Sequence, residues 1–251
     1  MKDTYITLES FRSALSQQQE CTDWYSEVPV HEFQFDSRAG NELTMTFGRG
    51  ITVEVPSVRF DSRALEGILE RLQVEGKGFR KLKAEVLAPT LNNFSAVAKG
   101  DAEIAIRDGK VFACLSSGAT KNDFRHLNSS DVLDKTEMSI HMNWGVEESF
   151  SGVLEDKYLQ AAFLLPEKEF SGNTYFVRLC FNTSDYGRSA IHYRADLVER
   201  SGAIIPVFEQ DITHRSGNTL DRIDETISML EKSIDDGTIR LEAMKSIVIN
   251  N

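Results

Sequence analysis

Alternating apolar and polar positions predict two β-hairpins in the first half of the chain. Apolar residues alternate over 43–47 and again over 51–55, on either side of a Gly-Arg-Gly turn. The same pattern fills 103–115, where Asp108-Gly109 separates two alternating runs. Asp-Gly in this setting is the strongest short hairpin signal of the sequence, because both central residues of the tight turn need positive φ.

Further strands are predicted before these hairpins and through most of the second half of the chain. The apolar residues of 28–35 change parity between Val30 and Phe33, which indicates a strand with a bulge or break there. Five more strands, most of them joined by Gly, Asn, Asp or Ser, are predicted at 147–154, 157–165, 174–182, 188–198 and 203–209. Pro166 and Pro206 fall at strand ends or edges, where a sheet tolerates proline.

Five other segments place an apolar residue at every third or fourth position, the spacing of one helix face. The predicted helices begin at Thr7 and end near Gln17–Gln19, run over 62–73, run over roughly 79–87 and stop at Pro89, begin at Ser129 or Ser130, and run over 218–235. The last helix carries its apolar residues at alternating intervals of three and four, from Leu220 to Ile234. This narrow stripe predicts that one face packs on another surface.

The order of these elements is mixed and shows no regular β-α-β alternation. It favours an α+β fold with a largely antiparallel sheet, flanking helices and a C-terminal amphipathic helix. A chain of 251 residues can bury a large core, as one domain or as two smaller ones. We expect one domain over 1–251, with a weak subdivision near 116–130, where Ser, Gly, Asn and Asp gather.

The chain is acidic, since 28 Lys and Arg against 39 Asp and Glu give a formal charge of −11. Proteins that bind nucleic acid mainly through phosphates leave a basic footprint, so this balance disfavours such binding as the main activity, although a local basic groove stays open. The excess charge suits a basic partner, including one that normally holds nucleic acid; the plainer interpretation is solubility. No run of 18 apolar residues predicts a membrane helix, and the first residues lack the apolar core of a signal peptide, so we expect a cytoplasmic protein without a membrane partner.

Few residue patterns point to catalytic chemistry. Cys21, Cys114 and Cys180 are far apart and form no CxxC pair, which predicts neither a disulfide framework nor a cysteine zinc site. Signatures of serine nucleophiles, phosphate loops and dinucleotide sites are absent from the sequence, so we expect no catalytic residues and no cofactor. The histidines form no HxH, HExxH or comparable pair, so no metal site is predicted. If the chain is an enzyme after all, the first candidates are His192, His214, Asp185 and Asp211, which flank one polar region.

One basic cluster stands out against the acidic background. Lys77, Arg80, Lys81 and Lys83 surround Phe79 within seven residues. On a helix the first three cations would lie close together, forming a face that contacts phosphates, with the phenylalanine as a stacking group. The alternative is that Phe79 points inward and the cations are simply solvated.

A polar connector joins the predicted strands 174–182 and 188–198. Its candidate binding residues are Asn182, Ser184, Asp185, Tyr186 and Arg188. Short polar side chains of this kind bond their own backbone and build a hairpin loop. The functional alternative is a recognition loop held on a rigid sheet.

These segments give the sequence its resemblance to a known family. Residues 182–191, Asn-Thr-Ser-Asp-Tyr-Gly-Arg-Ser-Ala-Ile, resemble the N-S-D-x-G-x-S-x segment of a large phage- and plasmid-associated family of unknown function. Residues 106–116 are similar to that family's R-x-x-G-x-V-R-A-x-L-S hairpin, and 214–218 occupy the place of its histidine-bearing segment before a helix. The three segments occur in the family's order and span roughly 80–235.

The chain departs from the family pattern at two places. It has Ser117-Gly118 where the family commonly has Arg-Tyr, and Arg200-Ser201-Gly202 where the family has Cys-Asn-Gly. The resemblance transfers no catalytic residue. It implies a setting, namely genes on mobile elements near replication, recombination or host-takeover functions.

Two functional hypotheses from different classes follow. The first is a non-enzymatic binding protein of a phage or plasmid that engages a host protein or nucleoprotein complex, with inhibition of a host defence system as one version. An uneven distribution of the acidic residues over the folded surface would favour it. The second is a direct binder of single-stranded nucleic acid that uses the 77–83 cluster together with Arg188, Arg194, Tyr186 and Tyr193.

Overall fold

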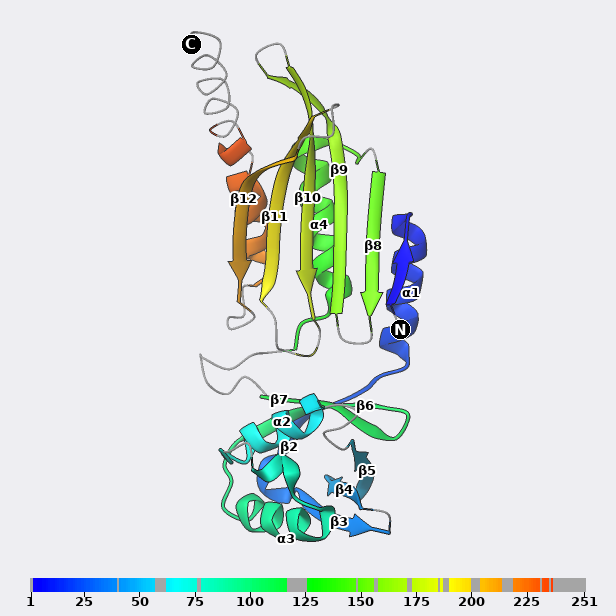
Figure 1. Cartoon of the computed structure of the whole chain (residues 1–251), viewed down its shortest axis with the longest axis vertical. Helices are drawn as coiled ribbons and strands as arrows, with labels where there is room; N and C mark the ends of the chain where they lie inside the picture. Colours follow the sequence, from blue (N-terminus) through cyan, green and yellow to red (C-terminus); the bar gives the residue numbers. More distant parts are fainter. Residues whose placement is uncertain are drawn as a thin grey trace. The chain divides into compact units, whose positions relative to one another are not determined.

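The chain forms two compact units, each with its own sheet and its own apolar core (Figure 1). The computed structural model describes residues 2–39, 41–56, 62–75, 78–116, 126–147, 149–155, 158–170, 173–184, 186, 190–199, 204–213, 219–230, 232–234 and 236. Unit 1 consists of 1–16 and 127–251, and unit 2 of 17–126. The sequence predicts one domain with a weak subdivision near 116–130. The chain passes from unit 2 back to unit 1 between residues 126 and 127, which lie inside that segment. It passes from unit 1 to unit 2 between residues 16 and 17, within a helix, where nothing in the sequence indicates a boundary.

Unit 1 is built on a six-stranded antiparallel sheet of order β1-β8-β9-β10-β11-β12. Its strands are β1 (Lys2–Tyr5), β8 (Ser149–Glu155), β9 (Tyr158–Phe170), β10 (Asn173–Thr183), β11 (Ile191–Glu199) and β12 (Ile204–Ile212). Strands β8 to β12 form a meander, because each pairs with the next along the chain. The N-terminal strand β1 joins the sheet beside β8, with Thr4 opposite Val153.

Helices cover one face of this sheet. They are α1 (Leu8–Glu20), α4 (Ser129–Trp144) and a last helix, which is described over 221–230 and 232–234. Along β10 every second side chain, from Tyr175 to Phe181, is buried against these helices, as the period of two in a strand requires. Phe11 of α1 lies directly on β8, and a Cβ at Gly152 would come within 2.6 Å of its ring. Glycine at this position therefore allows the close approach of helix and strand.

Unit 2 contains a six-stranded sheet of order β2-β6-β7-β5-β4-β3. Its strands are β2 (Asp23–Pro29), β6 (Asp101–Arg107), β7 (Lys110–Ser116), β5 (Ile51–Val55), β4 (Glu42–Phe47) and β3 (Gln34–Arg38), and all neighbours are antiparallel except β5 and β7. The helical segments are α2 (Ser62–Arg71), α3 (Ala84–Ser95) and two short 3-10 turns, η1 (Val30–Glu32) and η2 (Phe79–Lys81). Asn92 of α3 donates to the carbonyl of Phe35 at 2.8 Å and accepts from its backbone N–H at 2.6 Å, which ties the helix to β3.

The predicted α+β class and both predicted hairpins are confirmed. Asp108 and Gly109 have φ of 51° and 70°, the left-handed values that the turn requires. The stripe of the last helix is also confirmed, since Ile223, Ile227 and Leu230 are fully buried. None of the helices in the described part of the chain is long and apolar enough to cross a membrane.

One local prediction is wrong. The helix expected over 79–87 is a 3-10 turn followed by α3, which begins at Ala84 and runs past Pro89 to Ser95. Pro89 faces outward in the second turn of α3, where its missing N–H costs only one hydrogen bond and the buried Leu87 and Leu91 hold the helix on the sheet. The break expected in the strand over 28–35 is confirmed, because η1 separates β2 from β3 at the place where the parity changes.

Candidate functional site

The described part of the basic cluster in unit 2 combines exposed cations with an aromatic ring that packs on the core. Phe79 packs edge-on against Phe94, with 6.2 Å between the ring centroids, and Arg80 forms an ion pair with Glu66. Lys81 and Lys83 are exposed, and Lys77 lies outside the described residues. The cluster therefore presents a weaker cationic face than its sequence suggests, and its aromatic ring belongs to the core of unit 2.

The polar connector also has a structural role in its described part. Ser184 is 5 % exposed, and its Oγ accepts the backbone N–H of Tyr186 at 3.3 Å, a local bond that shapes the loop. Tyr186 and Tyr193 are buried, so neither ring has an accessible face on which a base could stack. Asn182 is half-buried on β10, opposite His192. Asp185 and Arg188 lie outside the described residues.

The sheet face opposite the helices carries a row of charged side chains on β10, β11 and β12. His192 Nδ1 lies 2.7 Å from Asp211 Oδ1, and its Nε2 lies 3.3 Å from Glu209 Oε1. Two candidates of the enzyme alternative, His192 and Asp211, are thus brought together, whereas His214 and Asp185 fall outside the described residues. Both nitrogens of the imidazole face carboxylates of β12. These contacts link the edge strand β12 to its neighbour β11.

A buried carboxylate anchors the same face. Asp196 is fully buried, and each of its oxygens accepts a hydrogen bond from an arginine: Arg178 Nη2 at 2.7 Å and Arg194 Nε at 2.8 Å. The hydrogen bond that Arg178 donates to Asp196 is the main reason why the pKa of Arg178 is raised. Two arginines compensate the desolvation of one carboxylate, which is the condition for keeping a charge inside a protein.

Acidic charge is distributed unevenly over the molecule. Unit 1 has 23 acidic and 14 basic residues, a formal charge of −9, which leaves −2 for unit 2. Within unit 1, acidic side chains mark the outward sides of α4 and the last helix. The exposed ones are Asp131, Asp134, Asp221, Glu225 and Asp236. Because Asp224 bonds both Lys135 and Ser139 of α4, the two helices lie side by side.

Exposed methionines lie among these acidic residues. Met138 and Met142 are one turn apart on α4 and are 51 % and 65 % exposed, and Met229 on the last helix is 54 % exposed. The outward positions of α4 follow the spacing 131, 134, 138 and 142, and those of the last helix follow 221, 225, 229, 232 and 236. One of these residues, Lys232, is basic. We call the other eight, five acidic residues and three methionines, the acidic methionine surface. Methionine is flexible and polarizable, and is common on surfaces that adapt to a partner.

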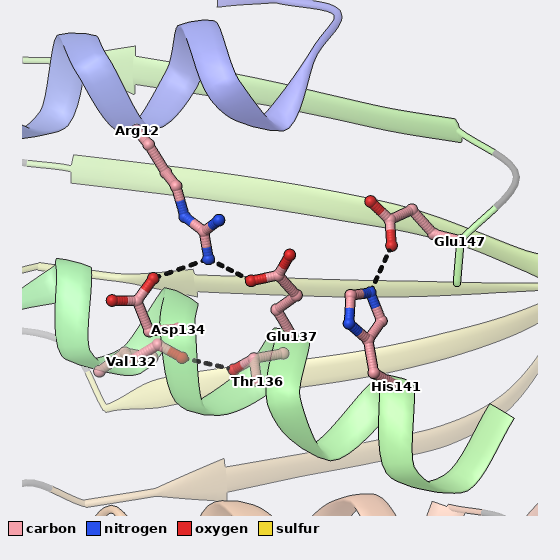
Figure 2. A network of polar contacts seen from close by, with 7 residues as sticks. All are labelled: Arg12, Val132, Asp134, Thr136, Glu137, His141 and Glu147. Atoms are coloured by element: carbon pink, nitrogen blue, oxygen red, sulfur yellow. Dashed lines mark hydrogen bonds and ion pairs between the residues drawn. The ribbon is translucent and has the colours of Figure 1, made fainter. Parts of the chain in front are cut away.

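A polar network joins α1 to α4 (Figure 2). Arg12 Nη2 contacts Asp134 Oδ1 at 2.8 Å and also pairs with Glu137. Burial lowers the pKa of Arg12, but the two carboxylates outweigh this effect and leave the pKa raised. A pocket of about 360 Å³ lies beside this network, lined by Arg12, Leu15, Ser16, Ser130, Leu133 and Asp134.

The C-terminal half of α4 and the residues that follow it bring together three side chains whose proximity the sequence does not fully reveal. Glu137 and His141 are four residues apart, and Glu147 returns to the helix end after Gly145, so that its Oε2 lies 2.9 Å from His141 Nε2 (Figure 2). Each of the three offers one nitrogen or oxygen atom, and these atoms all lie within 4.8 Å of one another. The sequence contains a signal for this group, since an i, i+4 Glu-His pair stands just before a helix-ending glycine.

Comparison with known protein families, with curated proteins and with solved structures found no match to this chain.

Proposed function

We propose that this chain is a non-enzymatic binding protein that engages a basic, partly apolar segment of a nucleic-acid-handling protein complex. The observation that carries the proposal is the acidic methionine surface. The resemblance of the sequence to a phage- and plasmid-associated family extends this proposal. In the extended form, the chain is a phage or plasmid protein that acts on a host complex, and that complex can be a defence system.

The chemistry of the surface defines the partner. The acidic residues attract a basic surface over a distance of about one Debye length, roughly 8–10 Å in physiological salt. Met138, Met142 and Met229 supply adaptable apolar contact on the same surface. An amphipathic segment that is basic on one side and apolar on the other matches both features. Such segments are frequent in proteins that bind nucleic acid, because their basic side chains normally contact phosphates.

The first test is a titration with two fluorescent probes, an amphipathic peptide of leucine and lysine and a single-stranded oligonucleotide. We expect the peptide to bind, the affinity to fall with salt, and the oligonucleotide not to bind. Oligonucleotide binding without peptide binding would overturn the proposal in favour of the direct nucleic-acid binder. Binding of neither probe would refute both.

A charge-matched pair of variants locates the binding surface. Asp131→Asn/Asp221→Asn/Glu225→Gln neutralises three exposed acids of the acidic methionine surface. The control variant, Glu32→Gln/Glu75→Gln/Glu85→Gln, neutralises three exposed acids of unit 2. Exposed charge pairs contribute about 0.2–1 kcal/mol each, so the first variant is expected to bind the peptide about tenfold more weakly and the control to bind it as the wild type does.

Affinity purification of the tagged protein from a bacterial host, with and without nuclease, then searches for the natural partner. We expect a stoichiometric protein that survives nuclease, is retained by the unit 2 control and is lost with the three-site variant. A partner retained equally by both variants would show that binding uses another surface.

A further inference from the structure

We propose that Glu137, His141 and Glu147 form a binding site for a zinc-type divalent metal ion at the C-terminal end of α4. The site is independent of the proposed function, because it requires no partner and uses none of the residues that are varied in the binding test.

Local backbone geometry creates the site. Residues four apart on a helix share a face, which puts the side chains of Glu137 and His141 one above the other. Gly145 ends α4 with a φ of 85°, a left-handed value, and its backbone N–H still bonds the carbonyl of His141 at 3.2 Å. The chain then returns past the last turn and presents Glu147 to the imidazole (Figure 2).

The spacing of the three donor atoms suits a metal ion. Zinc lies about 2.0–2.2 Å from nitrogen and oxygen ligands, so the ligand atoms around it are about 3–3.5 Å apart. The donor atoms of Glu137, His141 and Glu147 already lie within 4.8 Å of one another. Side-chain rotations that shorten the longest of these separations by up to about 1–2 Å would bring the three atoms to zinc-ligand spacing, and the bond between His141 and Glu147 would be exchanged for bonds to the metal.

The donor set selects the class of ion. An imidazole with two carboxylates fits Zn²⁺ and neighbouring transition metals, whereas Mg²⁺ and Ca²⁺ prefer oxygen ligands alone. The side chains of Glu137 and Glu147 are only 17 % and 14 % exposed, whereas that of His141 is 38 % exposed. Two largely buried carboxylates thus supply negative charge, and the open side leaves room for water as a further ligand.

Arg12 positions one of the ligands. Its guanidinium pairs with Oε2 of Glu137 and with Asp134, so that it fixes the carboxylate on the α1 side and leaves Oε1 for another bond. Partners that orient a ligand in this way typically change metal affinity by 10–100-fold when they are removed.

The test is calorimetric titration of the chelator-treated full chain with ZnCl2, in a Cys21→Ser background, because Cys21 is an exposed thiol. We expect one equivalent to bind with an affinity at least tenfold higher than that for MgCl2. Glu137→Gln, His141→Asn and Glu147→Gln should each weaken zinc binding at least tenfold, and Glu85→Gln, at an exposed site of unit 2, should not.

A spectroscopic readout distinguishes this site from adventitious surface binding. Co²⁺ in a site with three protein ligands should give d–d absorption bands that the Glu147→Gln variant lacks. Circular dichroism checks that each variant keeps its fold. Absence of saturable zinc binding, equal binding of Zn²⁺ and Mg²⁺, or undiminished binding by all three ligand variants would each overturn the proposal.

Discussion

The hydrogen bond between Thr136 of α4 and Tyr193 of β11 predicts an unequal response to its two partners. Thr136 Oγ1 lies 2.7 Å from the carbonyl oxygen of Val132 and 2.6 Å from the hydroxyl of Tyr193, and both side chains are fully buried. A threonine hydroxyl has one hydrogen, and the carbonyl can only accept it. Thr136 therefore accepts from Tyr193, and the tyrosine is the donor.

The two single substitutions leave different groups without a partner. Tyr193→Phe removes the donor, whereas Thr136 keeps its bond to Val132, so the cost is that of one hydrogen bond, about 0.5–1.5 kcal/mol. Thr136→Val removes the acceptor and leaves a buried O–H unsatisfied, which costs about 1–3 kcal/mol. In the Thr136→Val background, replacing the tyrosine as well removes the unsatisfied group. Tyr193→Phe should therefore stabilise the Thr136→Val protein although it destabilises the wild type.

Urea denaturation followed by tryptophan fluorescence measures this double-mutant cycle. The chain has two tryptophans, Trp24 in unit 2 and Trp144 in unit 1, so a Trp24→Phe background reports unit 1 alone. With an m-value of about 1–3 kcal/mol/M, a loss of about 2 kcal/mol lowers the midpoint by roughly 1 M urea. Additive effects, or a Thr136→Val protein that is more stable than the Tyr193→Phe protein, would refute the assignment of donor and acceptor.

Three further predictions follow from single contacts. Gly67→Ala should lower the urea midpoint of unit 2, measured by the fluorescence of Trp24. Alanine favours helices over glycine by about 1 kcal/mol, but its Cβ would lie 2.3 Å from the carbonyl oxygen of Cys114. An unchanged midpoint would contradict this close packing. Burial raises the pKa of Cys114 to about 12, so at pH 8 a thiol reagent should modify exposed Cys21 far faster, and rapid labelling of Cys114 in the native protein would be inconsistent with that burial. Burial alone would raise the pKa of Asp224. The hydrogen bonds that Lys135 and Ser139 of α4 donate to its carboxylate have the larger effect, and the pKa is lowered. The stabilisation by this carboxylate is then complete above about pH 4 and lost as the pH falls through the folded-state pKa, so Asp224→Asn should flatten the acid limb of a stability–pH curve, and an unaltered limb would refute the assignment.

Elements with strong local signals could be predicted from the sequence. The Asp108-Gly109 turn specifies its own backbone conformation, and the stripe from Leu220 to Ile234 specifies the buried face of the last helix. Strand β1 could not be predicted, because four residues have too little pattern and their partner, β8, lies about 150 positions away. The extent of α3 was missed for the opposite reason: a local rule about Pro89 was outweighed by packing on the sheet.

The candidate sites could likewise be predicted from the sequence only in part. The basic cluster and the polar connector are visible in the sequence, but the side chains that pair with Arg80 and enclose Tyr186 come from elsewhere in the fold. The acidic methionine surface and the Glu137–His141–Glu147 group depend on which side of α4 faces outward. Helical periodicity alone leaves that orientation open, because the face is fixed by the core residues of β8 to β12.

The division of unit 1 by unit 2 has a consequence for biosynthesis. The chain begins unit 1, leaves it at residue 16 and resumes it at 127, with Lys2 paired to Glu155. On a ribosome, all of unit 2 emerges before β8 exists, so unit 2 can complete its core while the N-terminal strand still lacks its neighbour. Contacts this distant in sequence close late and slowly. A chain interrupted before β12 would thus contain a finished unit 2 attached to an unfinished sheet with its apolar face exposed.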